Sequence, residues 1–214
     1  MRLALWIALL VPIAAMYMGM KTKKYVWNCV LTLSCAAIVL LTGRGMMMAP
    51  LVAALVISVV ADYFMGHKSG KPMRYIYGIA GFLLAHIGFC VYSLGRFAGS
   101  PRIYIAGAAL LGMIGWYLKA RVLPKLKGNK PMQIAVGAYS LVSVLSLIAA
   151  AGLQGATPFE NLLYAVGIAM IVWSDTMIAE TDFVGNKEWA SFIMPTYYLC
   201  HILVAASAVV GMAV

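Results

Sequence analysis

Two aspartates end long apolar stretches of the sequence, where a carboxyl group is costly. Asp62 closes "ALVISVVAD" and Asp175 closes "GIAMIVWSD". A charge in the hydrocarbon core costs about 2.5–3.5 kcal/mol on insertion scales, so an acid there marks a candidate functional site. A carboxyl group kept from water can stay protonated and donate its proton, whereas one with hydrogen-bond donors stays ionised. The pair predicts acid-base chemistry. The division of roles between the two acids is open, and Ser174 favours Asp175 as the ionised partner.

Other polar side chains interrupt neighbouring apolar stretches at a similar predicted depth. Tyr197 and His201 are four residues apart and share a helix face, as do Ser58 and Asp62. Such side chains can bond to a carboxyl group or hold a substrate, so we expect them around the two acids. The predicted set is Ser58, His86, Tyr92, Tyr139, Ser140, Ser174, Tyr197, Tyr198 and His201.

The elements that must position these residues are membrane-spanning helices. The chain is 64% hydrophobic and 10% charged, against roughly 45–50% and 25% in soluble domains. Apolar runs of about 17–25 residues, long enough to cross a bilayer, recur between short polar breaks. Helices are predicted because lipid offers the backbone no hydrogen-bond partners. We predict one all-α transmembrane domain over residues 1–214, a polytopic bundle with eight spans at 3–20, 25–42, 49–66, 74–94, 102–120, 132–152, 159–180 and 189–213.

The positive charges predict the orientation of these spans. Twelve of the 16 Lys and Arg lie in the breaks after the first, third, fifth and seventh spans. By the positive-inside rule these breaks face the cytoplasm and both termini face outward. The charge therefore indicates a lipid bilayer with an anionic surface as the partner, and not nucleic acid. The predicted location is the cell membrane, the inner one if the source is bacterial.

Polar groups elsewhere in the chain need less explanation. The four other acids fall at or beyond predicted helix ends, where water reaches them, so the outer half of the membrane is predicted to lack a comparable polar cluster. The four cysteines lie within spans without a CxxC motif and are predicted to be packing residues, so we expect no metal and no cofactor. The acids are Glu160, Glu180, Asp182 and Glu188, and the cysteines are Cys29, Cys35, Cys90 and Cys200.

The spacing of polar residues indicates an internal repeat. The separation of Asp62 from Asp175 nearly equals that of His86 from His201. Spans one to four and five to eight would then form two parallel four-helix halves, with a pocket at their interface.

The ordered motifs resemble the eight-helix lysoplasmalogenase-like (YhhN-type) membrane proteins. The similarity covers nearly the whole chain, in which "KKYVWN", "SVVAD", "GFLLAHIGFCVY", "YSLV", "GIAMIVWSD" and "TYYLCH" follow one another. Two positions depart from the pattern: Tyr25 stands after Lys24 where the family usually has Lys-Pro, and His201 stands where Gln is common. The resemblance implies a lysophospholipid substrate, whose vinyl-ether bond is hydrolysed to a fatty aldehyde and a glycerophospho-base.

That chemistry fits the two acids. Vinyl-ether hydrolysis needs a proton on the β-carbon and an anion beside the resulting oxocarbenium ion, a demand that glycosidases meet with two carboxyl groups. We predict that Asp62 and Asp175 divide these roles, and that His86 positions or deprotonates the water.

The remaining predicted residues stabilise charge or bind substrate. Tyr139 and Tyr197 would bond the developing oxygen charge, and His201 would support Tyr197. The lipid would enter sideways from the inner leaflet, tail first among apolar side chains. Cations at cytoplasmic helix ends would hold its phosphate, and these are Lys24, Arg121 and Lys130.

Other functions fit parts of the pattern. A proton-coupled transporter also carries paired membrane acids, but it needs a polar path across the whole membrane. A structural or sensory protein could pair its acids between helices, with a pocket too small for an acyl chain. A serine esterase would need Ser174 and Asp175 to cooperate, although adjacent helical residues point about 100° apart.

Overall fold

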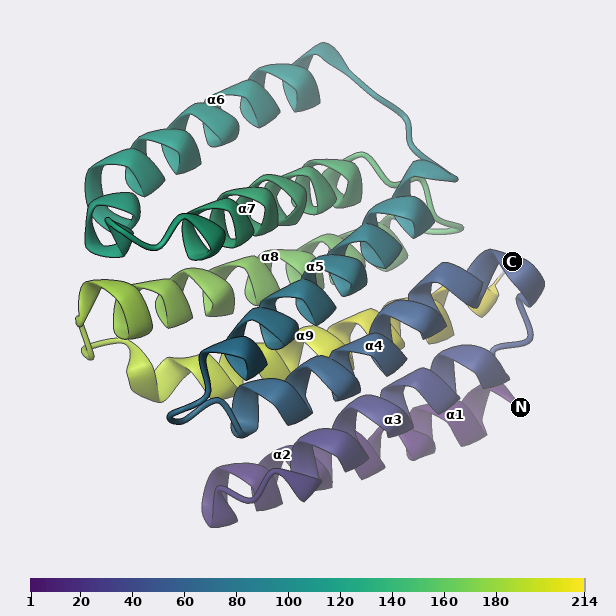
Figure 1. The fold of residues 1–214 in the computed structure, drawn as a ribbon. Coiled ribbons are helices and arrows are strands. Elements are labelled where there is room, and N and C mark those ends of the chain that lie inside the picture. Colours follow the sequence, from purple (N-terminus) through teal and green to yellow (C-terminus); the bar gives the residue numbers. More distant parts are fainter. Residues whose placement is uncertain (214) are drawn as a thin grey trace.

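The chain folds into a bundle of roughly antiparallel helices that cross a membrane several times (Figure 1). The computed structural model describes residues 1–213, and within them no strand forms. This confirms the predicted all-α polytopic bundle. The helices are α1 (Arg2–Ala8), α2 (Leu10–Thr22), α3 (Val26–Leu41), α4 (Ala49–Gly66), α5 (Pro72–Leu94), α6 (Pro101–Tyr117), α7 (Lys130–Ala151), α8 (Pro158–Ala179) and α9 (Ala190–Val210).

Each predicted span corresponds to one helical crossing. The first is divided into α1 and α2 at Leu9, three residues before Pro12. Proline has no backbone N–H and therefore cannot donate a helical hydrogen bond. Seven crossings are long and apolar enough to span a membrane, and α3, with 16 residues, is the short one. The proposed repeat of two four-helix halves stays a prediction.

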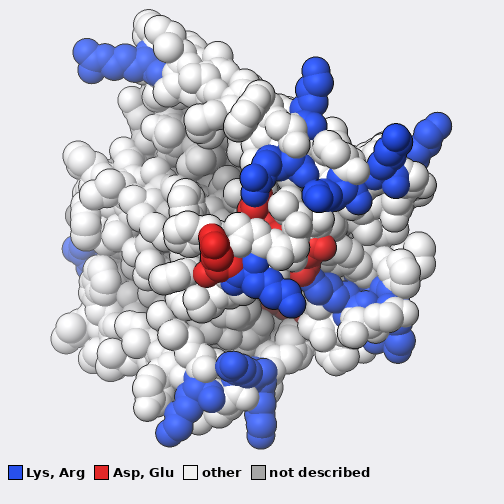
Figure 2. Space-filling model, turned by 90° about the vertical axis from the view of Figure 1, so that its left-hand side faces the viewer, with Lys and Arg blue, Asp and Glu red and all other residues white. Residues whose placement is uncertain are grey.

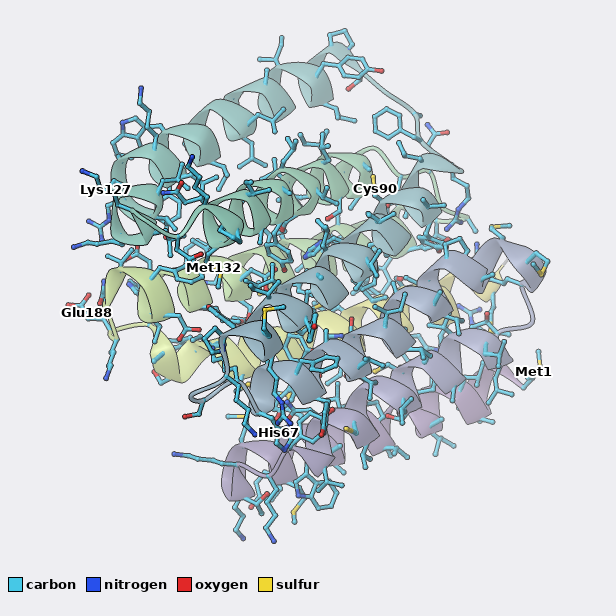
Figure 3. The ribbon with its side chains drawn as sticks, viewed as in Figure 1. Met1, His67, Cys90, Lys127, Met132 and Glu188 are labelled. Carbon is cyan, nitrogen blue, oxygen red and sulfur yellow. The ribbon has the colours of Figure 1, made fainter. Side chains whose placement is uncertain are left out.

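The two ends of the bundle differ in charge. The loops that join α2 to α3, α4 to α5, α6 to α7 and α8 to α9 meet at one end, which we call the basic end. Blue Lys and Arg side chains are spread over this face around a few red acids (Figure 2). His67, Lys127 and Glu188 lie at this end, and Met1 lies at the other (Figure 3). By the positive-inside rule the basic end is predicted to be cytoplasmic.

The helices differ widely in burial. In the most apolar 18-residue stretch of α9, 61% of the residues are buried, so α9 forms the centre of the core. The same stretch of the crossing that contains α6 has 6% of its residues buried, and α6 lies at the margin of the bundle (Figure 1). This margin borders the second pocket described below.

Glycines let α4 and α5 approach closely. A Cβ atom added to Gly88 would lie 2.9 Å from the Ala54 Cβ and 2.9 Å from the Pro50 carbonyl oxygen, and one added to Gly81 would lie 2.8 Å from the Ala61 Cβ. Real Cβ atoms do not pack this closely, so any larger residue must push the helices apart. Because α4 carries Asp62, this contact also fixes the position of an acid.

We therefore expect Gly88→Ala to lower the midpoint of thermal unfolding in detergent. Overpacking of a tight contact costs about 1–3 kcal/mol. Gly112→Ala is the matched control, because nothing lies within 4 Å of the added Cβ on α6, and alanine favours a helix over glycine by about 0.5–1 kcal/mol. Equal midpoints for the two variants would contradict the close contact.

Candidate active site

Both aspartates line one open cavity at the basic end of the bundle. The cavity, which we call the acid cavity, measures about 640 Å³ and lies among α2, α3, α4, α5, α8 and α9. Asp62 comes from α4 and Asp175 from α8, so residues far apart in sequence share the same space. Its other polar walls are contributed by Lys23, Tyr25, Asn28, Lys68, Ser174, Asp182, Ser191, Tyr197 and Tyr198.

Asp62 is held by a tyrosine from α9. The Tyr197 hydroxyl donates to Asp62 Oδ2 at 2.7 Å, and Asp62 is buried apart from 7% of its surface. Tyr197 is itself fixed by edge contacts with the rings of Phe82, at 5.9 Å, and His201, at 4.5 Å. His201 Nδ1 also donates to the Tyr197 carbonyl oxygen at 2.9 Å. The structure thus brings Tyr197 and His201 to Asp62, while their predicted roles toward the substrate stay predictions.

Asp175 has a different set of partners. The Tyr139 hydroxyl donates to Asp175 Oδ2 at 2.6 Å, and His86 Nε2 lies 3.2 Å from the same oxygen. His86 is fully buried, while the Asp175 side chain is 14% exposed. Two predicted residues thus meet one of the acids, from α7 and α5.

Two hydroxyl groups and one carboxyl group surround the buried ring of His86. The Ser146 hydroxyl donates its single hydrogen to the Ser143 carbonyl oxygen at 2.7 Å, so His86 Nδ1, 2.9 Å from Ser146 Oγ, must be the donor in that contact. The Ser143 hydroxyl lies 3.5 Å from Nε2. At 3.2 Å, a bare Nε2 lone pair would face the Asp175 carboxylate, an unfavourable contact. A proton on Nε2 would remove this repulsion by donating to the Asp175 oxygen.

Three predicted serines and a tyrosine have other contacts. Ser58 is buried and donates to the Ala54 carbonyl of its own helix at 2.9 Å, so it does not reach the cavity. Ser174 lines the cavity but donates to the Ile193 carbonyl at 3.0 Å and not to Asp175. Ser140 lines a neighbouring pocket described below. Tyr198 lines the acid cavity and donates to Asn28 Oδ1 at 2.5 Å.

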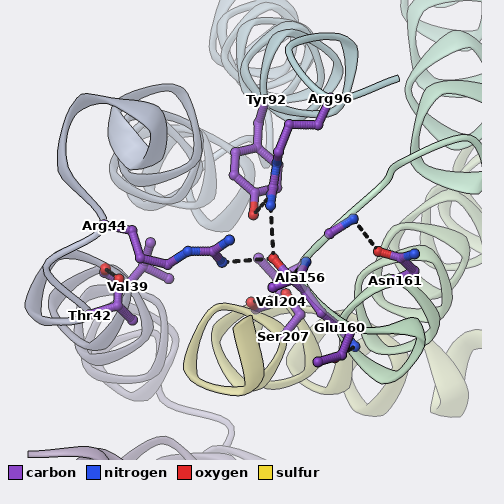
Figure 4. Close-up of polar contacts among 12 residues, drawn as sticks. Val39, Thr42, Arg44, Tyr92, Arg96, Ala156, Glu160, Asn161, Val204 and Ser207 are labelled. Carbon is purple, nitrogen blue, oxygen red and sulfur yellow. Dashed lines mark hydrogen bonds and ion pairs between the residues drawn. The ribbon is translucent and has the colours of Figure 1, made fainter. Parts of the chain in front are cut away.

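Tyr92 lies at the opposite end of the bundle. It packs against Tyr164, with ring centroids 5.1 Å apart, and accepts a hydrogen bond from Arg96 (Figure 4). Its predicted place beside the two acids is wrong, because α5 carries it roughly 30 Å from the basic end at about 1.5 Å per residue.

The end that contains Tyr92 has its own buried charges. Glu160 is fully buried and accepts from Arg44 at 2.7 Å and from Arg96 at 3.1 Å (Figure 4). The expectation that water reaches Glu160, and that this half lacks a polar cluster, is wrong. The cluster ties the loop before α4 to the end of α5 and the start of α8.

The cations at the cavity differ from the predicted ones. Lys24 and Lys130 are exposed and line neither of the pockets described here, and Arg121 is paired with Glu180 at 3.0 Å. Lys23 and Lys68 line the acid cavity, and Lys68 pairs with Asp182 there. Lys23 is the chain neighbour of the predicted Lys24, and Lys68 was not among the predicted cations.

Asn28 was also missed. It is a polar side chain inside the apolar run of α3, and it accepts the Tyr198 hydrogen bond at the wall of the acid cavity. The available signal was the side-chain amide of Asn28 in "KKYVWN". Burying an amide within a span costs free energy, as burying the hydroxyl of Ser58 or Tyr139 does.

The site offers two carboxyl groups with unequal surroundings, a histidine beside one of them, and two lysines on the cavity wall. Asp62 has one neutral donor, whereas Asp175 has a tyrosine and a histidine. Among the described residues, no three His, Cys, Asp or Glu side chains cluster as a metal site requires. Such a pair can deliver a proton to a substrate and receive one from water.

Comparison with known proteins agrees with the motif order. The model of the YhhN family matches residues 23–208, which include both aspartates and all the side chains that contact them. Neither the curated proteins nor the solved structures contain a match.

Proposed function

Because the chain belongs to the YhhN family, we propose that it is a membrane hydrolase that cleaves the vinyl-ether bond of lysoplasmalogens with Asp62 and Asp175. The observation that carries this proposal is the convergence of the two acids on one cavity at a membrane end. Family membership supports a hydrolase in general. The acids, with their separate partners, supply the specific chemistry.

The first step is proton transfer to carbon. Asp62 is buried with a single neutral donor and no cation at bonding distance, which favours its protonated form. Its proton passes to the β-carbon of the vinyl ether, and the carbon bonded to the ether oxygen becomes an oxocarbenium ion. The Asp62 carboxylate that remains stabilises this cation, as carboxylates do in glycosidases.

Water then completes the reaction, and both acids return to their starting states. Asp175, which accepts from Tyr139 and lies beside His86, takes a proton as water adds to the oxocarbenium carbon. The resulting hemiacetal gives its hydroxyl proton to Asp62, while Asp175 returns its proton to the departing glycerol oxygen. One water is consumed, and a fatty aldehyde and a glycerophospho-base are released.

The cations of the acid cavity suit the phosphate of this substrate. Lys23 and Lys68 stand on the wall that faces the loops, with Asp62 and Asp175 deeper in the same space. A phosphate at the two lysines leaves the uncharged part of the lipid near the acids. Lys68 would exchange its Asp182 partner for the phosphate.

A proton-coupled transporter is the alternative. It needs a polar path to the other end, where Glu160 offers charge. However, Glu160 is fully buried and paired with two arginines, and a Cβ added to Gly211 would lie 2.2 Å from Arg44 Nη1. The cluster is packed too tightly for a path, so the geometry favours the hydrolase.

The test is aldehyde release by the purified full chain in detergent. We expect a fatty aldehyde from 1-alkenyl lysophospholipids and none from 1-alkyl analogues, which cannot form the oxocarbenium ion by protonation of carbon. Release of fatty acid from 1-acyl lysophospholipids would indicate an esterase instead. Substrate uptake into vesicles without any aldehyde would favour the transporter.

A further inference from the structure

A second pocket meets the acid cavity at Asp175. It lies among α5, α6, α7 and α8 on the lateral side of the bundle, and we call it the lateral pocket. Met65, Phe82, Asp175 and Ile178 line both spaces. The lateral pocket is much smaller, about 70 Å³ against about 640 Å³. Asp175 therefore stands where a large cavity and a small one join.

The two spaces differ in chemistry. The acid cavity carries Lys23, Lys68 and Asp182 on its walls. The lateral pocket contains no Lys or Arg, and apart from Asp175 its walls are mainly aliphatic and aromatic, as at Ile114, Val136, Val144 and Phe183. A phosphate would lose its water there without gaining a cation, whereas a hydrocarbon chain would gain apolar contact.

The lateral pocket borders the bilayer through α6. Ile114, Tyr117 and Leu118 form its wall on that side, and the crossing that contains α6 is the least buried in the bundle. At the basic end, Tyr117 and Arg121 both donate to Glu180, at 2.9 Å and 3.0 Å, and so join the crossing of α6 to the end of α8 beside the pocket. On the lipid side, the wall of the pocket is therefore a single poorly buried crossing.

We propose that the lateral pocket holds the single hydrocarbon chain of the lipid substrate while the acid cavity holds its phosphate end. This inference rests on the proposed function and adds the direction in which the substrate lies. A chain in the lateral pocket and a phosphate at the lysines place the bond between them beside Asp175. The small volume of the pocket admits one chain and limits how much of that chain the pocket holds.

The first test is the dependence of turnover on chain length. Ile114→Trp fills the α6 wall of the pocket, and Met113→Trp places the same ring on the adjacent, 61% exposed position. We expect Ile114→Trp to lower the ratio of kcat/KM for long-chain to short-chain alkenyl lysolipids by at least about tenfold. An apolar pocket discriminates about 10–200-fold between substrates that differ by one methylene group. Met113→Trp should keep the wild-type ratio. An unchanged ratio in Ile114→Trp would overturn the assignment.

The second test does not need turnover. A 1-O-alkyl lysophospholipid with a diazirine at the chain end is photo-crosslinked to the wild-type chain, with excess unlabelled lipid as competitor. We expect competed labels on residues 111–118 and 136–144, and their loss in Ile114→Trp. Competed labels confined to α2 or α9 would overturn the lateral pocket as the chain site.

The two tests separate this inference from the proposed reaction. Labels in the lateral pocket, with no aldehyde from any alkenyl lipid, would support the chain site and reject the hydrolase. Aldehyde release with labels only on α2 or α9 would support the hydrolase and reject the chain site.

Discussion

Asp175→Asn is expected to lower kcat for alkenyl lysolipids by about 10²–10⁴-fold, the usual contribution of a positioned acid or base. The amide keeps the shape of the carboxyl group but cannot take a proton from water. It also leaves His86 Nε2 without the anion that lies 3.2 Å away. Asp62→Asn should cause a loss of the same order, because an amide cannot deliver the first proton. The loss of turnover in both variants is measured as aldehyde release after a single addition of substrate.

The control for these variants is Glu188→Gln. It makes the same change from carboxyl to amide at an exposed position outside both pockets, and it should keep wild-type turnover. Gel filtration and the thermal unfolding midpoint show whether the aspartate variants fold. Full activity in a folded Asp62→Asn or Asp175→Asn protein would contradict the two-acid mechanism.

The spans could be predicted because hydrophobicity alone decides them. The predicted 49–66 is the observed α4, and the ends of α3, α7 and α9 differ from the prediction by at most three residues. The π-helical turn at Glu180–Val184 was not predicted. It extends α8 beyond the apolar run and brings Asp182 to one pocket and Phe183 to the other, an arrangement set by tertiary contacts.

Counting residues along antiparallel helices predicted a similar depth for the two acids and their partners. It did not predict which partner meets which acid, and the structure pairs Asp62 with Tyr197 and Asp175 with His86 and Tyr139. The same count excludes Tyr92, which lies almost at the far end of α5.

The cations depended on loop geometry, which the sequence did not reveal. Lys23 ends α2 in a left-handed conformation, with φ of 55°, and this turn places it at the cavity instead of Lys24. A non-glycine residue rarely adopts that conformation, and its occurrence depends on the chain that follows. Lys68 reaches the cavity through its pairing with Asp182, from a residue more than 100 positions away.

Glu160 was predicted to be exposed to water because it lies near a helix start, but it is fully buried. It lies three residues after Thr157, whose hydroxyl accepts from the Glu160 N–H at 3.0 Å, so the sequence there is an ordinary helix start. The arginines that bury it come from the loop before α4 and from the end of α5. Only the packing of three helices shows that this end is closed.

We expect Glu160→Gln to produce the largest loss of stability among single substitutions at the ionisable groups. The variant leaves Arg44 and Arg96 in the protein interior without their shared anion. Removing one partner of a buried ion pair costs about 3–5 kcal/mol. The Ala156 N–H, which donates to Glu160 at 2.6 Å, would also lose a charged acceptor. The readout is the thermal unfolding midpoint in detergent.

Two comparisons make this prediction specific. Arg44→Gln should cost less than Glu160→Gln, because Glu160 would keep Arg96 and no buried charge would stand alone. Glu188→Gln, an exposed acid, should leave the midpoint unchanged. Glu160 lies roughly 22 Å along α8 from Asp175, at about 1.5 Å per residue, so turnover per folded molecule at low temperature should be kept. A Glu160→Gln protein with a normal midpoint and lost turnover would mean that this end of the bundle takes part in function, as a transport path requires.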